Sequence, residues 1–528
     1  MTYATITVAS HHFVLSRIHP RMRAVTKELA HMLRLPAQSF VNKRGQRIKS
    51  GKDKYYYGIT EDRSEVRYHI NLLDTFKKLL YRHHLDGEGM IEWKELPPYQ
   101  PSKIALAIRE HFIPSEMQEE AIEYIVDPSR PNNKAVIMQA GAGKTLVAMM
   151  AAAKQGHRIG IFVEPKYIGQ WLKAFEENCH IDPKRICVIG ADEKKGYKTS
   201  DKLKSLINMA FDGPLPYDAI IVSLTTYRNY IEAYELYGNA KDLENNEGYS
   251  VVPHDFFEHM GIGLRIIDEA HENFHMVFRL DLYTHVANSV ALSATLFADE
   301  RQLFLNEQIE RAYPKRLRFD KGGFNKYVTA YSLHFSLRDP RSIKVMGSMG
   351  YSHIEFEKSL MKSKEKTKAF FTMTRESMRY TYDLNYRKGD RCLVYFASIE
   401  MCTLFTEFIQ KEYPHLNVKR FVENDPLENL LTADISVSTV RSAGTGKDIA
   451  QLTTVIMTLA INASPTNIQG FGRLRDLNRR DPTLGRKMYF VYFVGDDFEK
   501  HIEYHENKRE LLRTRALSYE KRFYGTMI

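Results

Sequence analysis

Residues 138–145 read Met-Gln-Ala-Gly-Ala-Gly-Lys-Thr, a glycine-rich stretch that could bind the phosphates of a nucleotide. In such a loop the backbone N–H groups and the N-terminus of the following helix face the phosphates, Lys144 pairs with the β- and γ-phosphate oxygens, and Thr145 holds Mg²⁺. The residues expected to form the backbone cradle are Gly141, Ala142 and Gly143. Because Met138 replaces the usual first glycine, an ordinary glycine-rich turn is the alternative.

An acidic pair, Asp268-Glu269, begins the sequence Asp-Glu-Ala-His at residues 268–271, directly after the apolar run 263–267. Carboxylates at the carboxyl edge of a parallel sheet can bind Mg²⁺ and activate the water that attacks a γ-phosphate. We therefore predict that Asp268 binds Mg²⁺ and that Glu269 acts as the base. A solvated acidic strand end is the alternative, and the phosphate loop earlier in the same predicted sheet disfavours it.

The same stretch contains His271-Glu272-Asn273-Phe274-His275, which fits the zinc motif H-E-x-x-H. On a helix, two such histidines lie one turn apart and bind zinc while the glutamate acts as a base, which would make the protein a zinc metallopeptidase. However, His271 already belongs to the strand-end motif, and no third ligand follows at a typical spacing. A phosphate loop also has no role in peptidase chemistry, so we expect no zinc.

Two series of short apolar runs alternate with helical stretches, as expected for the strands of parallel sheets that are buried on both faces. The first series comprises residues 135–138, 159–163, 219–222, 263–267 and 289–292, and the second comprises 392–396, 418–422, 435–437, 454–457 and 488–493. The sequence therefore predicts an α/β protein with two such domains in tandem. We place the hinge between them at 311–326.

The N-terminal residues differ from both series and predict an α+β accessory domain. Strand-like pieces at 5–8 and 55–59 accompany a helical stretch at 70–80, and a proline-rich loop follows at 96–101. The predicted domains are therefore 1–105, 106–315 and 316–528.

Two further segments are interpreted from their polarity. Residues 237–248 are polar and partly acidic, which favours a surface insertion. In the C-terminal tail, basic residues between 508 and 522 alternate with glutamates, which favours a solvated helical face over a nucleic-acid contact.

The composition is that of a soluble globular protein. The 528 residues have a net charge of +10, and the length predicts three or four domains. The longest apolar stretch, at 146–153, is far shorter than the roughly 18 residues that a membrane helix needs, so no membrane contact is expected. Four cysteines without a C-x-x-C pair indicate neither a disulfide framework nor a thiolate zinc site.

The order and spacing of the motifs resemble those of superfamily 2 helicases from about residue 105 to the C-terminal region. The resemblance implies two RecA-like domains that hydrolyse ATP with Mg²⁺, and it implies that Gln118 reads adenine, although the usual neighbouring aromatic is replaced by Met117. The implied contacts with the nucleic-acid backbone are Pro165 in motif Ia and Thr225 and Thr226 after the next strand. Ser293-Ala294-Thr295 resembles motif III, which links the ATP state to strand binding.

The second series carries the remaining helicase motifs. Residues 394–398 resemble motif IV, and residues 438–439 with 446–448 resemble motif V, which implies nucleic-acid contacts at Ser398 and Thr439 and nucleotide contacts at Gly446 and Asp448. Residues 469–475 resemble motif VI, in which Gln469 and an arginine reach the nucleotide across the cleft between the domains. Asp476 stands where the second arginine is usual, so the arginine finger is either Arg473 or Arg475.

Among superfamily 2 motors, the short linkers, Gln170-Trp171 after motif Ia and the N-terminal accessory domain resemble phage UvsW-type helicases, which are related to the XPB and RecG motors. That resemblance implies ATP-driven remodelling of branched DNA, such as fork regression, branch migration or junction unwinding. A duplex DNA translocase that separates no strands, an RNA helicase, and a scaffold without ATP turnover are the alternatives. The expected compartment is the cytoplasm, that of the host if a phage encodes the protein.

Residues 43–54 hold six basic residues against one acid, Asp53, and three tyrosines follow. Because lysines and arginines neutralise phosphates and tyrosines stack on bases, this segment could be an accessory DNA contact. The predicted contacts are Lys43, Arg44, Arg47, Lys49 and Tyr55. An edge hairpin that lysines keep soluble, with tyrosines as β-formers, explains the pattern equally well.

Overall fold

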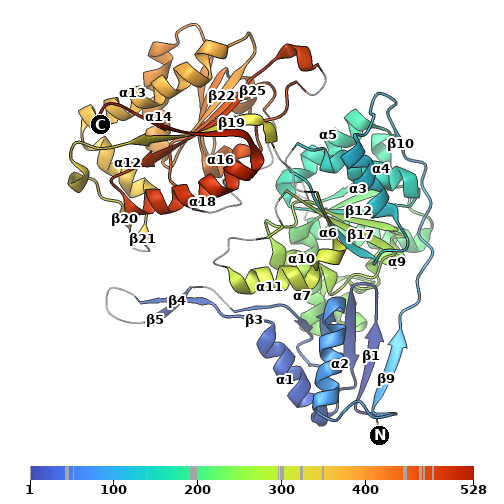
Figure 1. Cartoon of the computed structure of the whole chain (residues 1–528). Coiled ribbons are helices and arrows are strands. Elements are labelled where there is room, and N and C mark those ends of the chain that lie inside the picture. The colour runs from blue at the N-terminus through green and yellow to red at the C-terminus, as the bar shows by residue number, and fades with distance from the viewer. Residues whose placement is uncertain are drawn as a thin grey trace. The chain divides into compact units, whose positions relative to one another are not determined.

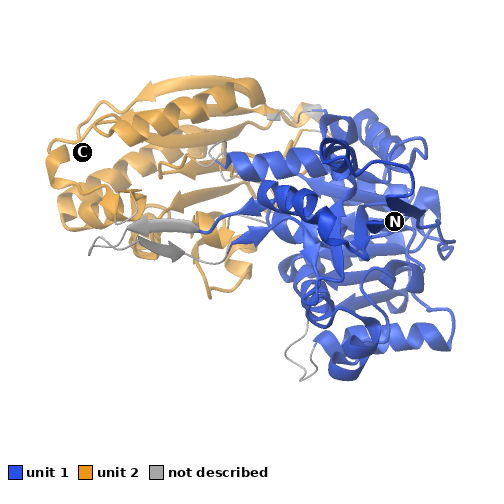
Figure 2. Ribbon diagram, turned by 90° about the horizontal axis from the view of Figure 1, so that it is seen from below, with its two compact units in different colours: residues 1–138, 143–321 blue, residues 139–142, 322–528 orange. Residues whose placement is uncertain are grey.

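The fold is described by a computed structural model of the chain (Figure 1). It describes residues 2–41, 47–50, 53–139, 141–190, 199–294, 296–297, 302–321, 325–347, 350–443, 449–462, 467, 470–478 and 481–528, without the side chains of 38–41, 47–50, 325 and 482. The chain divides into two compact units, residues 1–138 with 143–321 and residues 139–142 with 322–528 (Figure 2). Within the described part of the chain, no helix is long and apolar enough to cross a membrane.

The first unit contains a seven-stranded parallel sheet, which confirms the α/β prediction. Its strand order is β14-β15-β12-β16-β17-β11-β18. The strands are β11 (Asn133–Ile137), β12 (Ile159–Val163), β14 (Ile186–Ile189), β15 (Ala219–Ser223), β16 (Leu264–Ile267), β17 (Asn288–Ser293) and β18 (Arg318–Asp320). The predicted hinge at 311–326 is therefore too long, because β18 adds an edge strand to this sheet.

Helices connect and cover these strands. They are α3 (Glu116–Val126), α4 (Lys144–Gln155), α5 (Ile168–Asn178), α6 (Thr199–Asp212), α7 (Leu224–Tyr237), α8 (Ala240–Glu247), α9 (Phe256–His259), α10 (Phe274–Asp281) and α11 (Leu303–Ala312). The expected insertion at 237–248 is the helix α8, whose Leu243 is buried. The first unit also contains a separate two-stranded pair, β10 (Ala107–Ile108) with β13 (Cys179–His180).

The second unit contains another seven-stranded parallel sheet, in the order β23-β24-β22-β25-β26-β19-β27. Its strands are β19 (Asn325–Phe335), β22 (Arg391–Phe396), β23 (Val418–Phe421), β24 (Ile435–Thr439), β25 (Leu452–Met457), β26 (Met488–Gly495) and β27 (Ala516–Phe523). Its helices are α12 (His353–Met361), α13 (Lys364–Thr381), α14 (Ile399–Glu412), α15 (Glu428–Thr432), α16 (Val440–Ala443) and α18 (Glu499–Arg515). A short hairpin, β20 (Met346–Gly347) with β21 (Gly350–Tyr351), precedes α12.

The C-terminal tail is only in part the solvated helical face that the sequence predicts, because most of its charged side chains are exposed but Lys508 is not. The helix α18 ends at Arg515, and β27 follows as an edge strand. Lys508 is buried, with its Nζ 4.7 Å from the centre of the Tyr492 ring, and burial lowers the pKa of this lysine to about 7. Charge alternation alone did not reveal that one lysine of the helix faces the sheet.

The N-terminal region is a five-stranded sheet in the order β7-β8-β2-β1-β9 with two helices. Its elements are β1 (Ala4–Val8), β2 (His12–Ser16), α1 (Arg23–Met32), β7 (Gly58–Ile59), β8 (Glu65–His69), α2 (Leu73–Arg82) and β9 (Ile91–Glu95). Two further pairs are β3 (Arg34–Leu35) with β6 (Lys54–Tyr55) and β4 (Gln38–Val41) with β5 (Arg47–Ser50). The predicted strand at 55–59 is thus two short strands in different sheets.

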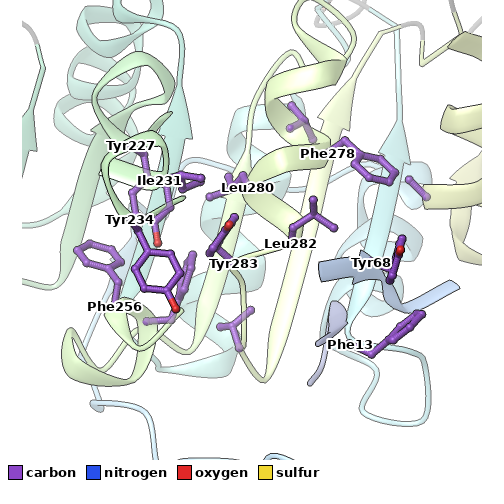
Figure 3. Close-up of a cluster of buried hydrophobic side chains, with 14 of the residues drawn as sticks. Phe13, Tyr68, Tyr227, Ile231, Tyr234, Phe256, Phe278, Leu280, Leu282 and Tyr283 are labelled. Atoms are coloured by element: carbon purple, nitrogen blue, oxygen red, sulfur yellow. The ribbon is translucent and has the colours of Figure 1, made fainter. Parts of the chain in front are cut away.

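The N-terminal region and the first α/β sheet share one hydrophobic core. Phe13 and Tyr68 from the N-terminal sheet belong to the same buried cluster as Tyr227, Phe278 and Tyr283 (Figure 3). Tyr56 is 1% exposed, and its ring lies 5.1 Å from that of Phe278. At about 25 cal/mol per Å² of apolar surface, such aromatic burial stabilises the contact between the two parts strongly.

A buried ion pair lies at the centre of this shared core. Arg265 on β16 and Asp281 at the end of α10 are both fully buried, and the guanidinium also donates to Ser289 Oγ and Thr284 Oγ1. His69 of the N-terminal sheet lies 3.4 Å from the other Asp281 oxygen. Burial alone would raise the pKa of Asp281, but the Arg265 charge and His69 hold it below its usual value.

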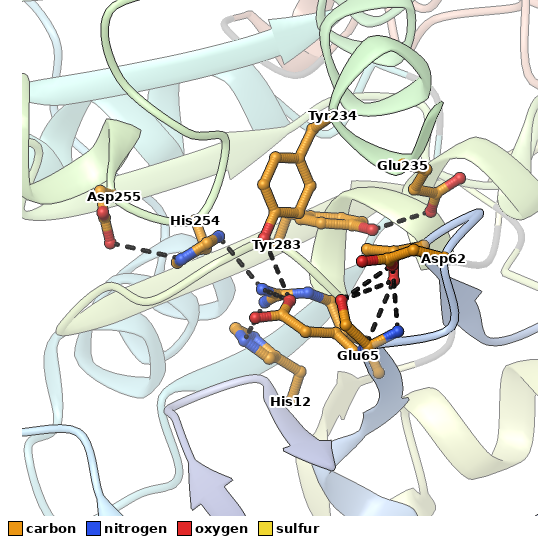
Figure 4. Close-up of polar contacts among 11 residues, drawn as sticks. His12, Asp62, Glu65, Tyr234, Glu235, His254, Asp255 and Tyr283 are labelled. Carbon is orange, nitrogen blue, oxygen red and sulfur yellow. Dashed lines mark hydrogen bonds and ion pairs between the residues drawn. The ribbon is translucent and has the colours of Figure 1, made fainter. Parts of the chain in front are cut away.

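Arg67 on β8 is a second buried cation that joins the two parts, and its partners Glu65, His12 and His254 are labelled in Figure 4. Its guanidinium forms an ion pair with Glu65 at 2.7 Å and donates to His12 and to His254 at 3.1 Å each. The guanidinium carbon also lies 4.7 Å from the centre of the Tyr283 ring. Burial first, and then the Arg67 charge, lower the pKa of both histidines, so these rings accept hydrogen bonds as neutral imidazoles.

This arrangement predicts that acid destabilises the first unit. When folding lowers the pKa of a histidine, the unfolded state binds the proton more tightly than the folded state, so the free energy of unfolding falls as the pH drops below the unfolded-state pKa of about 6.5. His254→Gln keeps an acceptor for Arg67 but cannot be protonated. Its free energy of unfolding should therefore depend less on pH below 6.5, by about 1.4 kcal/mol per pH unit.

Chemical denaturation between pH 5 and 7.5 measures this slope. His84→Gln, which changes an exposed histidine, is the matched control and should retain the wild-type slope. An unchanged slope in His254→Gln would contradict the assignment of a neutral, buried His254.

Candidate active site

The predicted phosphate loop lies between β11 and α4, and residue 140 within it lies outside the described residues. Gly141 and Gly143 have positive φ angles of 81° and 85°, and Gly143 is the N-cap of α4. Only glycine adopts this backbone region at no steric cost. Lys144, the first residue of α4, is 8% exposed, and its Nζ donates to the carbonyl of Met138 at 3.3 Å.

Gln118 lies directly against this loop. It is buried on α3, and its Oε1 accepts from the backbone N–H of Ser115 at 2.9 Å in a capping box. A Cβ atom on Gly143 would lie 2.5 Å from Gln118 Nε2, which leaves no room for a side chain there. Gln118 therefore supports the phosphate loop, and its reading of adenine stays a prediction.

The acidic pair follows β16 at the carboxyl edge of the first sheet, as the sequence predicted. The Asp268 carboxylate is oriented at both oxygens, because Oδ1 accepts from the Glu269 N–H and Oδ2 accepts from Trp171 Nε1, each at 2.9 Å. Burial, and then the negative charge of Glu269, raise the pKa of Asp268 to about 6. A cation at this carboxylate would relieve that cost, and an oriented carboxylate with the Thr145 hydroxyl suits the oxygen preference of Mg²⁺.

Glu269 connects the acidic pair to the lysine and to the predicted motif III. Its Oε1 lies 3.8 Å from Lys144 Nζ, and its Oε2 lies 3.3 Å from His271 Nδ1. His271 Nδ1 is also 3.0 Å from Ser293 Oγ at the end of β17. Lys144, Glu269, His271 and Ser293 thus form one polar chain, while Thr295 lies outside the described residues.

The zinc motif does not have the geometry that zinc chemistry needs. The helix α10 begins only at Phe274, so His271 lies before it and the two histidines do not share a helical turn. His275 Nε2 instead lies 3.1 Å from the backbone carbonyl of Tyr55. Across the residues that the structure describes, no group of three or more potential ligands is placed to hold a metal ion.

The strand-contact candidates of the first unit lie at the carboxyl ends of the neighbouring strands β12 and β15. Pro165 begins a short 3-10 turn, Pro165–Tyr167, directly after β12. Thr225 is exposed in the first turn of α7, whereas Thr226 is buried and its N–H donates to Ser223 Oγ at 3.1 Å. Of the two threonines, Thr225 is the accessible one.

In the second unit, Ser398 follows β22, and Thr439 is the last residue of the neighbouring strand β24. Ser398 is the N-cap of α14, and both its N–H and its hydroxyl donate to the buried carboxylate of Glu357, at 2.7 and 2.6 Å. Thr439 Oγ1 accepts from the N–H of Ser442 at 3.2 Å. Gly446, Asp448 and Gln469 lie outside the described residues.

The two candidate arginine fingers differ in burial. Arg473 is 8% exposed and interacts with the buried Tyr395 hydroxyl, whereas Arg475 is half-buried. Burial raises the pKa of Tyr395, and the Arg473 charge opposes that rise.

The accessory contact is described only in part. Lys43 and Arg44 lie outside the described residues, and Arg47 and Lys49 are placed in β5 by their backbone alone. Tyr55 is 41% exposed and so could stack on a base, whereas Tyr56 is a core residue.

Sequence reasoning missed three residues whose side chains contact residues in or next to the predicted motifs: Trp171, Glu272 and Glu357. The Gln170-Trp171 pair was noted only as a family feature, and Glu272 only as part of the zinc motif. Nothing in the sequence around Glu357 marked it, because its partners lie 40 and 41 residues further along the chain.

One region of the chain is similar to a known protein family. The DEAD/DEAH box helicase family model matches residues 115–303. Residues 115–303 are therefore similar to an ATP-hydrolysing domain of the nucleic-acid helicase class, for which ATP and Mg²⁺ are the cofactors. No curated protein matches the chain.

Two solved structures with a related fold are of S. cerevisiae Dbp5. One shows Dbp5 bound to RNA and ADP BeF3, at 13% identity and a TM-score of 0.47, covering 78% of this chain and 90% of that one. The other shows a single-residue variant of Dbp5 with the same ligands, at 13% identity and a TM-score of 0.46, with the same coverage.

The close approach of Gln118 predicts the effect of a minimal change in the loop. Gly143→Ala would place a methyl group against Gln118 and would put a non-glycine residue at a positive φ, a backbone strain of about 1–3 kcal/mol. The loop should therefore shift, and ATP affinity should fall about tenfold. Titration with a fluorescent ATP analogue measures this affinity. Gly169→Ala in α5, where a Cβ would meet nothing within 4 Å, should bind the analogue like the wild type.

Proposed function

We propose that the chain is an ATP-dependent DNA helicase or translocase that remodels branched DNA. The observation that carries this proposal is the site at the carboxyl edge of the first sheet. Lys144, Asp268 and Glu269 lie there, and the loops after β12 and β15 begin at the same edge. A nucleotide and a nucleic-acid strand could therefore be bound by loops of one sheet.

In the proposed reaction, Lys144 neutralises charge on the β- and γ-phosphates, and Glu269 accepts a proton from the water that attacks the γ-phosphorus. The bond from that phosphorus to the bridging oxygen of ADP breaks as the new bond forms. Bound Mg²⁺, held by Asp268 and Thr145, would supply further neutralisation of phosphate charge. His271 would hold Glu269 in place through its contact with Ser293.

The resemblance to superfamily 2 assigns an arginine of the second domain to the γ-phosphate. We favour Arg475 over Arg473, because Arg473 is buried against Tyr395 and Arg475 is more exposed. Such an arginine would stabilise the charge of the transition state only when the two domains close, which couples hydrolysis to motion.

The charge of the N-terminal region supports a nucleic acid as the partner. Residues 1–105 hold 18 basic and ten acidic side chains, a net charge of +8 out of +10 for the whole chain. Such a concentration of positive charge favours polyanion binding through phosphate contacts. A duplex translocase and an RNA helicase remain the alternatives, and the substrate comparison below separates them.

Variants of the nucleotide site test the reaction. Lys144→Ala and Glu269→Gln should each lower kcat for nucleic-acid-stimulated ATP hydrolysis by about 100-fold or more, because each removes a group that stabilises the transition state. Arg475→Ala should lower kcat more than Arg473→Ala does. Steady-state phosphate release measures all four variants, and near-normal turnover in Lys144→Ala would refute the assigned site.

The accessory contact is tested by changing Lys43, Arg44, Arg47, Lys49, Lys52 and Lys54 together to glutamine. If these residues touch phosphates, DNA affinity should fall, and the slope of log affinity against log salt should become shallower by about 0.9 per lost contact on duplex DNA. Fluorescence anisotropy at several salt concentrations measures both quantities. Unchanged affinity and slope in a folded variant would favour the soluble edge hairpin.

The substrate class is tested by comparing ATPase rates and product gels on single-stranded DNA, duplex DNA, forks, four-way junctions and RNA. Branched DNA should give the highest rates and a change in strand pairing. Duplex stimulation without strand separation would instead indicate a translocase, and preference for RNA would indicate an RNA helicase.

A further inference from the structure

Two segments at the carboxyl edge of the first sheet are joined by four side-chain contacts. Residues 164–171 follow β12, and residues 268–273 follow β16, its neighbour in the sheet. The contacts are Asn273 Nδ2 to Glu164 Oε1 at 3.2 Å, Lys166 Nζ to Glu272 Oε2 at 2.6 Å, Tyr167 Oη to Glu272 Oε1 at 2.5 Å, and Trp171 Nε1 to Asp268 Oδ2 at 2.9 Å. The first segment includes Pro165, the predicted contact with the nucleic-acid strand, and the second includes the acidic pair Asp268-Glu269.

Glu272 is the centre of this contact set. Each of its carboxylate oxygens is held by a different residue of the first segment, the Tyr167 hydroxyl on one side and the Lys166 ammonium on the other. Its side chain is 15% exposed, and Tyr167 is 2% exposed, so the pair is largely shielded from water. Hydrogen bonds to an ionised group are stronger than neutral ones, and shielding strengthens them further.

Trp171 extends the contact set to the acidic pair. Its indole is fully buried and has a single hydrogen-bond donor, Nε1–H, which donates to Asp268 Oδ2. A movement of α5 would therefore move Asp268 Oδ2. Glu269, the next residue, has a positive φ of 47°, a strained backbone conformation that its surroundings must maintain.

We propose that this contact set transmits nucleic-acid binding at the loop after β12 to the ATP site, with Tyr167, Trp171 and Glu272 as positioning residues. A strand that binds at Pro165 would shift the turn Pro165–Tyr167, and Glu272 and Asp268 would follow because they are bonded to that segment. This inference rests on the proposed function. It also gives Glu272, the glutamate of the unused zinc motif, a role in coupling.

The test compares Tyr167→Phe, Glu272→Ala and the double variant with the wild type. Three quantities are measured: basal ATPase rate, the factor by which saturating single-stranded or forked DNA stimulates it, and DNA affinity without nucleotide. Each single variant should lose about fivefold or more of the stimulation factor, while the basal rate and DNA affinity stay near wild type. The double variant should lose no more than the stronger single variant, because both remove the same interaction.

Two further variants separate coupling from general damage. Glu272→Gln keeps an acceptor for Tyr167 and should recover part of the stimulation that Glu272→Ala loses, which a loss of packing alone would not explain. Glu177→Gln, which breaks the exposed Lys173–Glu177 pair on the same helix α5, is the matched control and should be stimulated normally. If Glu272→Ala does not fold, Tyr167→Phe and Glu272→Gln decide the outcome.

Wild-type stimulation in both Tyr167→Phe and Glu272→Ala would overturn the coupling role while leaving the proposed function intact. Additive losses in the double variant would overturn it as well, because the two residues would then act independently. If no nucleic acid stimulates the wild type, the proposed function fails, and the coupling inference falls with it.

Discussion

The buried ion pair between Arg265 and Asp281 fixes the part of the molecule on which the ATP site depends. Arg265 lies three residues before Asp268 on β16, and Asp281 ends α10. Removing one partner of a buried ion pair costs about 3–5 kcal/mol, because the other charge stays buried without compensation. The strand before residues 268–273 and the helix after them are therefore joined by this ion pair.

Such contacts explain how the acidic pair can keep an unfavourable conformation. Glu269 has a positive φ, and Asp268 is a buried carboxylate beside a second negative charge. Both features cost free energy and persist only when the surrounding structure holds them. The Arg265–Asp281 pair joins β16 to α10, the indole of Trp171 donates to Asp268, and His69 connects Asp281 to the N-terminal sheet.

The sequence predicted the two sheets well because parallel strands buried on both faces are short apolar runs, and Ile159–Val163 is reproduced to the residue. It failed at β18 and β27, since Arg-Phe-Asp and an edge strand rich in charge have no such pattern. Candidate roles for Lys144 and Asp268 could be predicted from the sequence because loop motifs are local. The contacts of Glu272 and Trp171 were not, because their partners lie about 100 residues away in the chain.

The same separation in sequence hid the common core of the N-terminal region and the first α/β sheet, where His12 meets Thr284. The N-terminal region is therefore not an independent domain. It is joined to the first α/β sheet through a buried arginine, two neutral histidines and a cluster of aromatic rings, so its removal would force the neighbouring core to repack. Deleting residues 1–105 would expose Phe278 and Tyr283 to solvent. The first unit should therefore unfold as one cooperative body. Its N-terminal part is better studied by surface substitutions than by truncation.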